Sequence, residues 1–525
     1  MLPRPLLIGL VILTALRWVV AGATELTPAE ALVWLGGREA GMGYFGHGPV
    51  ASWLSRVGTW VAGDTAIGVR LFAPLAVFGA SWLAWRLASS AFGEKAGGWF
   101  FVALQLTPLV NLAAVRALPE TYLFFFGVAG AWWLWQALHR ASRWVWQWLA
   151  AGLVFGVGVL SAPAGVALVA GMVTLLVVPR RWRGRWRSPG PWLAMICAAA
   201  GAAPWVWWLR DQAWLPLVGV RYDWARGLDP WAGLRWIGLG VLAASPFLFA
   251  GMVWSGARAA QAAWRSWRRY REGGLSRDDP WDQKNGRVFL LSLAMPSALW
   301  MVVEAITGGG GLGAAALVGS AALMMLAAVW VESPLAPTAH RLAQNASLLV
   351  AGGYSLLALH SDMARHLGVP WSYRMDPTSE IRGWKESTAQ TAAALRTIAT
   401  AQGASQQAFL IAESPGLAAI HEFYMTGDGP FPHASVTRIR CHVPARHAVD
   451  SDFSVWVSYA DETSWTGLDA LFVSESAEPE LLEVLSRQFD RLESLGRIEV
   501  RRGRWPVRRL SFFACRSWRG PARSP

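Results

Sequence analysis

The sequence predicts a polytopic α-helical membrane protein that ends in a soluble α/β domain. Of its 525 residues, 54% are hydrophobic and only 15% are charged, which is too apolar for an ordinary soluble enzyme. The chain holds 35 tryptophans, and the indole ring favours the bilayer interface because its body is apolar while its N–H stays hydrated. The long apolar runs end near residue 360, so the membrane part should come first.

A helix needs about 20 apolar residues to cross about 30 Å of hydrocarbon, and runs near this length occur about eleven times. They lie at 5–22, 66–88, 96–114, 119–138, 146–160, 164–178, 191–209, 232–256, 287–306, 312–331 and 344–360. The fifth and sixth runs are short, because Ser161-Ala162-Pro163 interrupts one apolar stretch. We therefore expect residues 1–360 to form a membrane domain with an external loop at 24–65.

The net charge of +13 does not indicate a nucleic-acid partner, because the basic residues lie in short loops between apolar runs. If the N-terminus is cytoplasmic, the cations of the inner connections are Arg140, Arg143, Arg180, Arg181, Arg183, Arg185, Arg187, Arg258, Arg265, Arg268, Arg269, Arg271, Arg277, Lys284 and Arg287. The loops at 24–65 and 210–231 balance their charges with acids, so the positive-inside rule places them outside. An odd number of spans then puts the C-terminal region outside too. We therefore expect these loops and the C-terminal region on the periplasmic or luminal side of the membrane.

Residues 361–525 have the composition of a soluble domain, with shorter apolar runs, charges of both signs and frequent turn residues. The patterns predict helices at 378–402, 415–425 and 478–492. Strands are predicted at 408–412, 453–458, 468–473, 494–501 and 506–514. This alternation favours an α/β layout.

Of the three cysteines, Cys197 falls in an apolar run, whereas Cys441 and Cys515 fall in the external domain. An oxidising compartment would allow a disulfide between these two. It forms only if their Cβ atoms approach within about 4 Å, and the sequence leaves that open.

The loop between the first two apolar runs gathers acids, a histidine and aromatic residues at a membrane surface. This composition suits an enzyme that moves a sugar from a lipid phosphate. Such an enzyme needs a carboxylate to take the proton of the acceptor, and a metal or cationic group to stabilise the phosphate leaving group. Because a lipid donor is confined to the membrane, its site belongs beneath an external loop.

Two segments of this loop, Ala29 to Trp34 and Gly43 to Pro49, read Ala-Glu-Ala-Leu-Val-Trp and Gly-Tyr-Phe-Gly-His-Gly-Pro. They resemble the Asp-Glu-Ala-x-x-Trp and Gly-Tyr-Phe-Asp-His-Pro-Pro stretches of the GT-C polyprenyl-phosphate-sugar glycosyltransferases, which include protein O-mannosyltransferases and the lipid A aminoarabinose transferase. Further similar segments are Gly63-Asp64, Gly68 to Leu71, Leu106 to Pro108, Leu118 to Glu120, Arg382 to Trp384, Leu417 to Tyr424 and Val507 to Cys515. The resemblance covers nearly the whole chain. It implies a GT-C-like fold and inverting transfer of a sugar from a polyprenyl phosphate to a lipid, glycan or protein acceptor. It also implies a bacterial inner-membrane protein whose active site and C-terminal domain are periplasmic.

The chain departs from this family at several motif positions. Ala29 and Gly46 replace two family acids, Gln212 stands where relatives tend to have a histidine, and Gly308 to Gly313 replace a lysine- and tryptophan-containing stretch. Alanine and glycine can neither accept a proton nor coordinate a cation through a side chain. The alternative is therefore a catalytically silent relative that binds lipid-linked glycan or assists envelope glycan assembly. Transport of a lipid-linked sugar is a third class, which calls for polar residues at broken helices in mid-membrane.

The resemblance implies that Glu30 and Glu120 are the catalytic acids, one in the first external loop and one at the outer start of the fourth span. A pair of carboxylates meeting there could share the role of base or bind a divalent cation such as Mg or Mn. The alternative for each is an acid placed in the first turn of a helix, where the helix dipole favours it. Glu25 and Glu39, in the same loop, are either substitutes for the lost acids or solvated charges.

The predicted substrate contacts are His47, Arg116, Tyr44 and Trp34. A guanidinium matches the geometry of a phosphate, and a histidine can donate to a phosphate or a sugar. The structural alternatives are an arginine that reaches along its stem to the interface and a hydrogen-bonded histidine. Two further arginines near span ends, Arg17 and Arg70, invite the same interpretations as Arg116, and Glu304 is either a functional or an interfacial acid.

Overall fold

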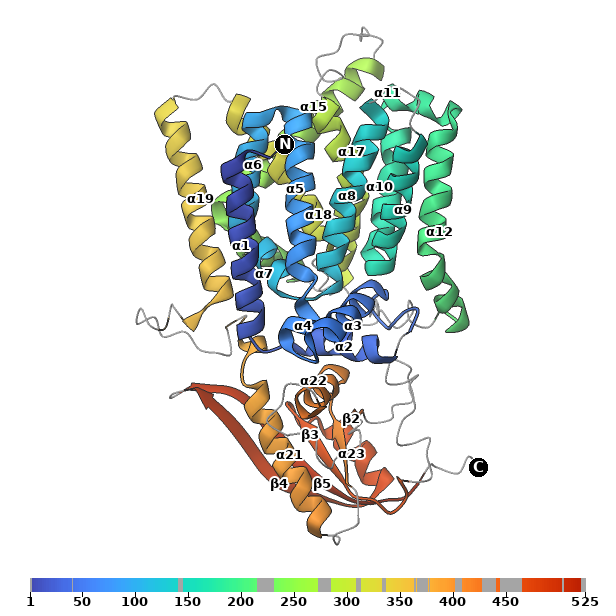
Figure 1. The fold of residues 1–525 in the computed structure, drawn as a ribbon, viewed down its shortest axis with the longest axis vertical. Coiled ribbons are helices and arrows are strands. Elements are labelled where there is room, and N and C mark those ends of the chain that lie inside the picture. Colours follow the sequence, from blue (N-terminus) through green and yellow to red (C-terminus); the bar gives the residue numbers. More distant parts are fainter. Residues whose placement is uncertain are drawn as a thin grey trace.

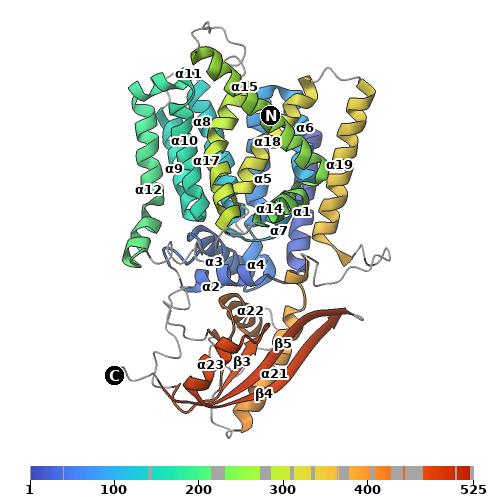
Figure 2. The ribbon, with the colours of Figure 1, turned by 180° about the vertical axis from the view of Figure 1, so that it is seen from behind.

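The chain forms three layers, a helical bundle, a thin layer of short helices beneath one end of it, and a β-sheet domain beyond that layer (Figure 1). Figure 2 shows the same order of layers from behind. The computed structural model describes residues 2–39, 41–139, 145–214, 231–271, 285–307, 313–332, 337–362, 365, 376, 378–401, 408–426, 441–443, 465–502 and 505–520. Residues 308–312 and most of the 210–231 loop lie outside this description.

A helix begins within or near each apolar run that the sequence predicts to span the membrane. The helices are α1 (Arg4–Ala23), α5 (Ala73–Phe92), α6 (Glu94–Leu106), α7 (Pro108–Val115), α8 (Pro119–His139), α9 (Val145–Ser161), α10 (Val166–Val177), α12 (Pro189–Asp211), α14 (Ala232–Ala244), α15 (Pro246–Arg271), α17 (Asn285–Thr307), α18 (Gly313–Glu332) and α19 (Pro337–Leu359). Among the described residues, six helices are long and apolar enough to cross a membrane, or eight if each bent pair is one span. The number of spans therefore stays a prediction.

Two of the predicted spans are bent. The axes of α6 and α7 meet at 62° where Thr107 precedes Pro108, and a proline both lacks an N–H and disfavours a helical residue before it. The axes of α14 and α15 meet at 110° around Ser245, whose φ of 78° lies in the left-handed region. Near the first bend, the buried Arg17 donates from Nη2 to Asn111 Oδ1 at 2.7 Å, so this arginine joins α1 to α7.

The predicted external loop folds into the layer of short helices α2 (Pro28–Glu39), α3 (Val50–Ala62) and α4 (Ala66–Arg70). Helix α2 begins with a reciprocal capping box. The Glu30 amide donates to Thr27 Oγ1 at 3.2 Å, while the Thr27 amide donates to Glu30 Oε2 at 3.0 Å. The loop after α2 packs tightly on the bundle, because a Cβ atom at Gly48 would lie 1.8 Å from the Leu160 carbonyl oxygen at the end of α9.

The C-terminal domain contains a five-stranded sheet of order β2-β1-β3-β5-β4, flanked by helices. The elements are α21 (Trp384–Ala401), β1 (Phe409–Ala412), α22 (Pro415–Thr426), β2 (Cys441–His442), β3 (Ala470–Ser474), α23 (Pro479–Gln488), β4 (Phe489–Arg502) and β5 (Trp505–Trp518). Strand β1 runs parallel to β2 and β3, whereas β5 runs antiparallel to β3 and β4, so the sheet is mixed.

The helix predicted at 478–492 is too long, because it ends at Gln488 and β4 begins at the next residue. Phe489 is buried and pairs with Trp518 in the sheet, so burial and strand pairing override the helical pattern there. The strand predicted at 453–458 lies outside the described residues.

The two external cysteines do not form a disulfide, since Cys515 is a free thiol. Cys441 lies on β2 and Cys515 on β5, with β1 and β3 between them. Three strand spacings amount to roughly 14 Å, about twice the largest Cα separation that a disulfide spans. Burial raises the pKa of the Cys515 thiol to about 12, which makes it unreactive.

One apolar core joins the short-helix layer to the C-terminal domain. It includes Leu26 and Trp34 from the external loop together with Ile420 and Phe423 from α22. The rings of Trp34 and Phe423 meet edge to face with centroids 5.0 Å apart, and a Cβ atom at Gly416 would lie 2.9 Å from Pro28 Cβ. The membrane domain and the C-terminal domain therefore fold against each other and are not independent units.

Hydrogen bonds fix the register of this contact. The Leu26 amide donates to the Tyr424 hydroxyl at 2.8 Å, and the Trp384 amide donates to Glu25 Oε2 at 2.5 Å. Glu25, which the sequence leaves open between a substitute acid and a solvated charge, thus binds the start of α21. The pairing makes α2 and α22 a single rigid unit.

The short-helix layer and the C-terminal domain lie at one end of the bundle, and the N-terminus and the basic segment α11 (Arg180–Arg183) lie at the other (Figure 1). The predicted external loop and the predicted external domain therefore share one side. The charged end of α15 lies on the opposite side with α11.

We expect acidification to destabilise the contact between α21 and α22 through His421, which is fully buried and hydrogen-bonded to Thr388 Oγ1 at 2.9 Å. Burial lowers the pKa of His421 from its usual 6.5 to about 3. Between these values the unfolded chain binds a proton that the folded imidazole does not, so stability falls as pH falls, by up to about 1.4 kcal/mol per pH unit.

Thermal unfolding at a series of pH values below 6.5 checks this, with His421→Gln as the variant that lacks the titrating group. The variant should lose stability less steeply on acidification than the wild-type protein. Equal slopes for the two proteins would contradict the assignment.

Candidate functional site

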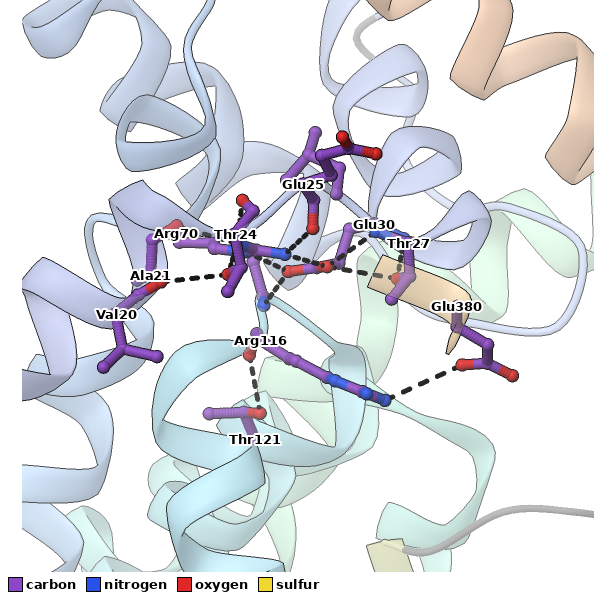
Figure 3. Close-up of polar contacts among 12 residues, drawn as sticks. Val20, Ala21, Thr24, Glu25, Thr27, Glu30, Arg70, Arg116, Thr121 and Glu380 are labelled. Atoms are coloured by element: carbon purple, nitrogen blue, oxygen red, sulfur yellow. Dashed lines mark hydrogen bonds and ion pairs between the residues drawn. The ribbon is translucent and has the colours of Figure 1, made fainter. Parts of the chain in front are cut away.

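A buried ion pair between Glu30 of α2 and Arg70 of α4 lies at the centre of the short-helix layer (Figure 3). Arg70 Nε donates to Glu30 Oε1 and Arg70 Nη2 to Glu30 Oε2, both at 2.6 Å. The Glu30 side chain has no exposed surface and that of Arg70 is 1% exposed. This two-point contact is the geometry in which guanidinium and carboxylate bind most strongly.

The remaining donors of Arg70 close the end of α1. Nη1 donates to the Ala21 carbonyl at 2.7 Å and to Thr24 Oγ1 at 2.8 Å, and Nη2 donates to the Glu25 carbonyl at 2.9 Å. The last carbonyls of a helix lack partners within the helix, and a cation placed there both binds them and complements the helix dipole. Arg70 therefore connects the first span to the external loop.

The carboxylate of Glu30 is fully occupied. Besides Arg70, it accepts from the Thr27 amide and hydroxyl at 3.0 and 3.1 Å and from the Ala117 amide at 2.9 Å. Burial alone raises the pKa of Glu30, but the Arg70 charge and these hydrogen bonds outweigh burial and hold that pKa below its usual range. In this arrangement Glu30 is ionised and has no oxygen lone pair left for the proton of an acceptor.

The hydrogen bond from the Ala117 amide to Glu30 fixes the turn between α7 and α8. Arg116 lies in this turn, and Glu120 lies in the first turn of α8. The Arg116 side chain is 17% exposed, and its Nη1 atom lies 3.8 Å from Glu380 Oε2 of the C-terminal domain (Figure 3). The Thr121 hydroxyl donates to the Arg116 carbonyl at 3.1 Å and holds the turn from inside. Glu30 thus fixes the backbone beside both predicted functional residues of this turn.

Glu120 begins α8, and among the described residues no side chain hydrogen-bonds to its carboxylate. A Cβ atom at Gly313 of α18 would lie 3.2 Å from Glu120 Cγ, so glycine leaves room for the acid. Glu304 of α17, which accepts from Trp300 Nε1 at 2.8 Å, lies close enough to interact electrostatically with Glu120. Glu304 is therefore within electrostatic range of Glu120, while the Glu30 carboxylate is bound by Arg70.

His47 and Tyr44 lie in the loop between α2 and α3, against the ends of α9 and α12. Their rings are 5.3 Å apart, and the two residues form an isolated antiparallel bridge. His47 Nδ1 is 2.8 Å from the Gly48 carbonyl oxygen, and burial lowers the pKa of His47, so the imidazole is neutral. The Tyr44 hydroxyl donates to the Gly36 carbonyl and accepts from the Gly41 amide, so it fixes the end of α2.

Trp34 is 1% exposed in the core shared with α22. Its Nε1 atom donates to Asp64 Oδ1 at 2.8 Å, and the guanidinium of Arg38 lies 4.8 Å from the centre of its ring. In this arrangement Trp34 holds α2 against the C-terminal domain.

The predicted divalent cation has no ready set of protein ligands in the part of the chain that the structure describes. No group of three or more histidine, cysteine, aspartate or glutamate side chains gathers there in a way that could hold a metal ion. Glu30 is saturated by nitrogen donors, and Glu120 and Glu304 are two carboxylates only. These residues do not fit a protein-held Mg or Mn site, and the chemistry proposed below uses none.

Solved structures of another protein are similar to this chain over nearly its whole length. ArnT from Cupriavidus metallidurans bound to undecaprenyl phosphate superposes with a TM-score of 0.56 at 17% identity, covering 98% of this chain and 99% of that chain. The chain therefore has the same fold as ArnT. The apo form of the same ArnT gives a TM-score of 0.56 at 15% identity, covering 97% of both chains.

Two sequence comparisons find similar proteins. Residues 46–208 match the family described as dolichyl-phosphate-mannose-protein mannosyltransferase. The lipid A galacturonosyltransferase RgtD of Rhizobium johnstonii is 26% identical over 238 residues. That alignment covers 44% of this chain and about half, 49%, of RgtD. The resemblance predicted from the sequence motifs is confirmed at the level of the fold.

Sequence reasoning misses the partner of Glu30. It treats Arg70 only as an arginine near a span end. Because every buried charge needs a counterion, a pair between Arg70 and a nearby acid could have been predicted. The pattern Thr27-x-x-Glu30 also signals a capping box, which already engages the carboxylate. Glu380 and Tyr424 give no signal, because their contacts depend on how the C-terminal domain docks.

We expect Glu30→Gln to destabilise the protein by about 3–5 kcal/mol, because the substitution leaves Arg70 buried and uncompensated. Arg70→Gln should cost a similar amount. The double variant Glu30→Met with Arg70→Met should cost clearly less than the sum of the two, since no unpaired charge remains.

Unfolding of the purified variants in detergent measures these differences. The matched control is Glu483→Gln, which alters the exposed Arg487–Glu483 pair, where side-chain exposures are 75% and 64%. This change should stay within about 1 kcal/mol. A loss for Glu30→Gln no larger than that of the control would contradict the structural role of the pair.

Proposed function

We propose that this protein transfers a sugar from a polyprenyl phosphate to a lipid, glycan or protein acceptor, at the bundle end covered by the C-terminal domain. The observation that carries the proposal is the turn between α7 and α8. It presents a partly exposed cation, Arg116, and a carboxylate without a hydrogen-bonded side chain, Glu120, within five residues of each other. An inverting transfer needs a cation at the leaving phosphate and a base at the acceptor hydroxyl, on opposite faces of the sugar.

Arg116 is the group that binds the phosphate of the donor. Its guanidinium is 17% exposed, and its contact with Glu380 Oε2, at 3.8 Å, is longer than a hydrogen bond. A phosphate oxygen can displace this carboxylate, because it offers shorter bonds with two-point geometry. As the sugar departs, Arg116 stabilises the negative charge that develops on the phosphate.

Glu120 is the base in this proposal. Its carboxylate takes the proton from the acceptor hydroxyl while the hydroxyl oxygen forms a bond to the anomeric carbon of the sugar. The bond from that carbon to the phosphate oxygen breaks on the opposite face, and the polyprenyl phosphate leaves with the electron pair. The configuration at the anomeric carbon is inverted. Glu304 is a second acid within electrostatic range of Glu120.

Glu30 then acts as a positioning residue. Its bond from the Ala117 amide sets the backbone next to Arg116, and its ion pair with Arg70 ties that backbone to the end of α1. His47 and Tyr44 line the opposite part of the same layer and are the candidates for sugar contacts. The loss of the family acids at Ala29 and Gly46 shifts the role of base to Glu120.

The similar proteins support a lipid-linked donor and a lipid or glycan acceptor. RgtD is named a lipid A galacturonosyltransferase, and ArnT was crystallised with undecaprenyl phosphate. Together with the positive-inside argument, they favour an inner-membrane protein whose site is periplasmic, in contact with membrane lipids.

A catalytically silent relative is the second candidate, favoured by one observation. Glu30 is the retained acid of the first motif, and all its acceptor positions are filled, while Ala29 and Gly46 carry no carboxylate. Such a protein would bind lipid-linked glycan, or assist envelope glycan assembly, without turnover.

We expect Glu120→Gln to lower the rate of sugar transfer by about 10²–10⁴-fold while donor binding persists, because the amide cannot accept the proton. The matched control is Glu94→Gln, which changes a glutamate in the first turn of α6 at the other end of the bundle. Transfer of radiolabelled sugar from a panel of polyprenyl-phosphate donors measures the effect. Full activity in Glu120→Gln would remove this residue as the base. A wild-type protein that binds donors but transfers nothing would favour the silent relative.

Glu380→Gln should tighten the binding of undecaprenyl phosphate by about twofold to fivefold, because an exposed ion pair that competes for Arg116 is worth up to about 1 kcal/mol. Glu380 is 63% exposed, so the substitution should not disturb the fold. Glu386→Gln, an exposed acid of α21 that contacts Gln390, is the control and should leave the affinity unchanged. Weaker binding in Glu380→Gln would show that Glu380 does not compete with the phosphate.

A further inference from the structure

A long β-hairpin projects from the C-terminal domain. Strands β4 and β5 pair along their whole length, up to Arg502 opposite Trp505. Strand β3 pairs with β5 only from Ser511 to Cys515, so within the described part of the sheet the outer half of the hairpin has no further strand beside it. The sheet alone does not explain a hairpin of this length.

The outer half of this hairpin is strongly basic. Residues 497–509 contain six arginines and one glutamate. That single acid, Glu499, already forms ion pairs with both Arg501 and Arg509. The side chains of Arg501, Arg502 and Arg509 are 63%, 62% and 60% exposed. Like charges this close repel one another unless anions lie nearby.

The outer end of the hairpin lies next to the end of the helical bundle. Arg502 Nη1 is 3.5 Å from Asp362 Oδ2, and Asp362 follows the end of α19 at Leu359 by three residues. Figures 1 and 2 both show the outer ends of β4 and β5 below the lower end of α19. Arg501 and Arg502 therefore lie near the end of a helix that is apolar and long enough to cross a membrane.

Contacts along the hairpin hold it in this direction. Arg508 Nη2 donates to the Ser379 carbonyl at 2.7 Å, and its guanidinium lies 3.7 Å from the centre of the Trp384 ring. Gly383, with a φ of 79°, lets the backbone before α21 pass close to Val500 and Val507, where a Cβ atom would lie 3.4 Å from each side chain. Trp384 also donates its amide to Glu25, so the hairpin is coupled to the external loop.

We propose that the outer end of β4, at Arg501 and Arg502, binds the headgroups of anionic phospholipids in the membrane beside α19. The charge is complementary, and a guanidinium matches the phosphodiester geometry. Phospholipid headgroups are the anions present at this position at the highest local concentration. The contact orients the C-terminal domain over the bundle end, and it holds whether or not the protein transfers a sugar.

Hydrogen–deuterium exchange of the full-length protein in nanodiscs tests the proposal. Residues 497–509 should exchange severalfold more slowly in discs that contain phosphatidylglycerol than in discs of phosphatidylcholine alone, because β4 is an edge strand whose outer amides the headgroups would cover. High salt should reduce this protection. Adding inorganic phosphate to phosphatidylcholine discs should not reproduce it, and equal protection by inorganic phosphate would overturn the lipid assignment.

Variants complete the test. Each arginine near an anionic surface contributes roughly a factor of five to binding, so Arg501→Gln with Arg502→Gln should weaken binding to phosphatidylglycerol by roughly thirtyfold and remove the severalfold protection. Arg501→Lys with Arg502→Lys keeps the charge and should keep most of the protection. The control is Arg487→Gln with Arg491→Gln, which alters two arginines, each 75% exposed, in the last turn of α23 and at the far end of β4. Protection that persists in the double Arg501/Arg502→Gln variant, or disappears equally in the control, would overturn the proposal.

Discussion

The arrangement of the external surface depends on one ion pair, Glu30 with Arg70, enclosed without solvent contact. Burying two charges is unfavourable unless every donor and acceptor finds a partner, and here the partners come from the end of α1, the start of α2, the end of α4 and the turn before α8. Because one pair satisfies groups from four segments, it determines how these segments lie relative to one another. The apolar core with α22 then extends this order into the C-terminal domain.

This structural use of Glu30 has a chemical consequence. A carboxylate that binds a guanidinium and three other donors cannot also take a proton from an acceptor. The base must then be another acid, one that the ion pair holds in position without hydrogen-bonding to it. Glu120 satisfies that condition, and Arg116 in the same turn keeps a partly exposed guanidinium. Trp34 could contact a sugar only if its packing against Phe423 opened. The turn between α7 and α8 is therefore the more accessible part of the site.

The sequence predicts much of the fold, because hydropathy and local capping act over short distances. Apolar runs locate the bundle helices, and Thr27 with Glu30 marks the start of α2. The sequence cannot predict contacts between distant segments, such as Arg70 with Glu30 or Glu380 with Arg116, since these follow from docking. For the same reason it leaves the pairing of Cys441 with Cys515 open, which strand order decides, and it extends a helix past Gln488, where Phe489 instead joins the sheet. The sequence identifies the residues of the site one by one, but their division into positioning and reacting groups needs the tertiary contacts.

An experimental structure of the full-length protein with undecaprenyl phosphate bound tests the central claim most directly. We predict that Arg70 remains on Glu30 with both contacts intact, while the phosphate lies on Arg116 and Glu380 has moved away. A structure in which Arg70 leaves Glu30 to bind the phosphate, and Glu30 turns toward the acceptor side, would contradict the account.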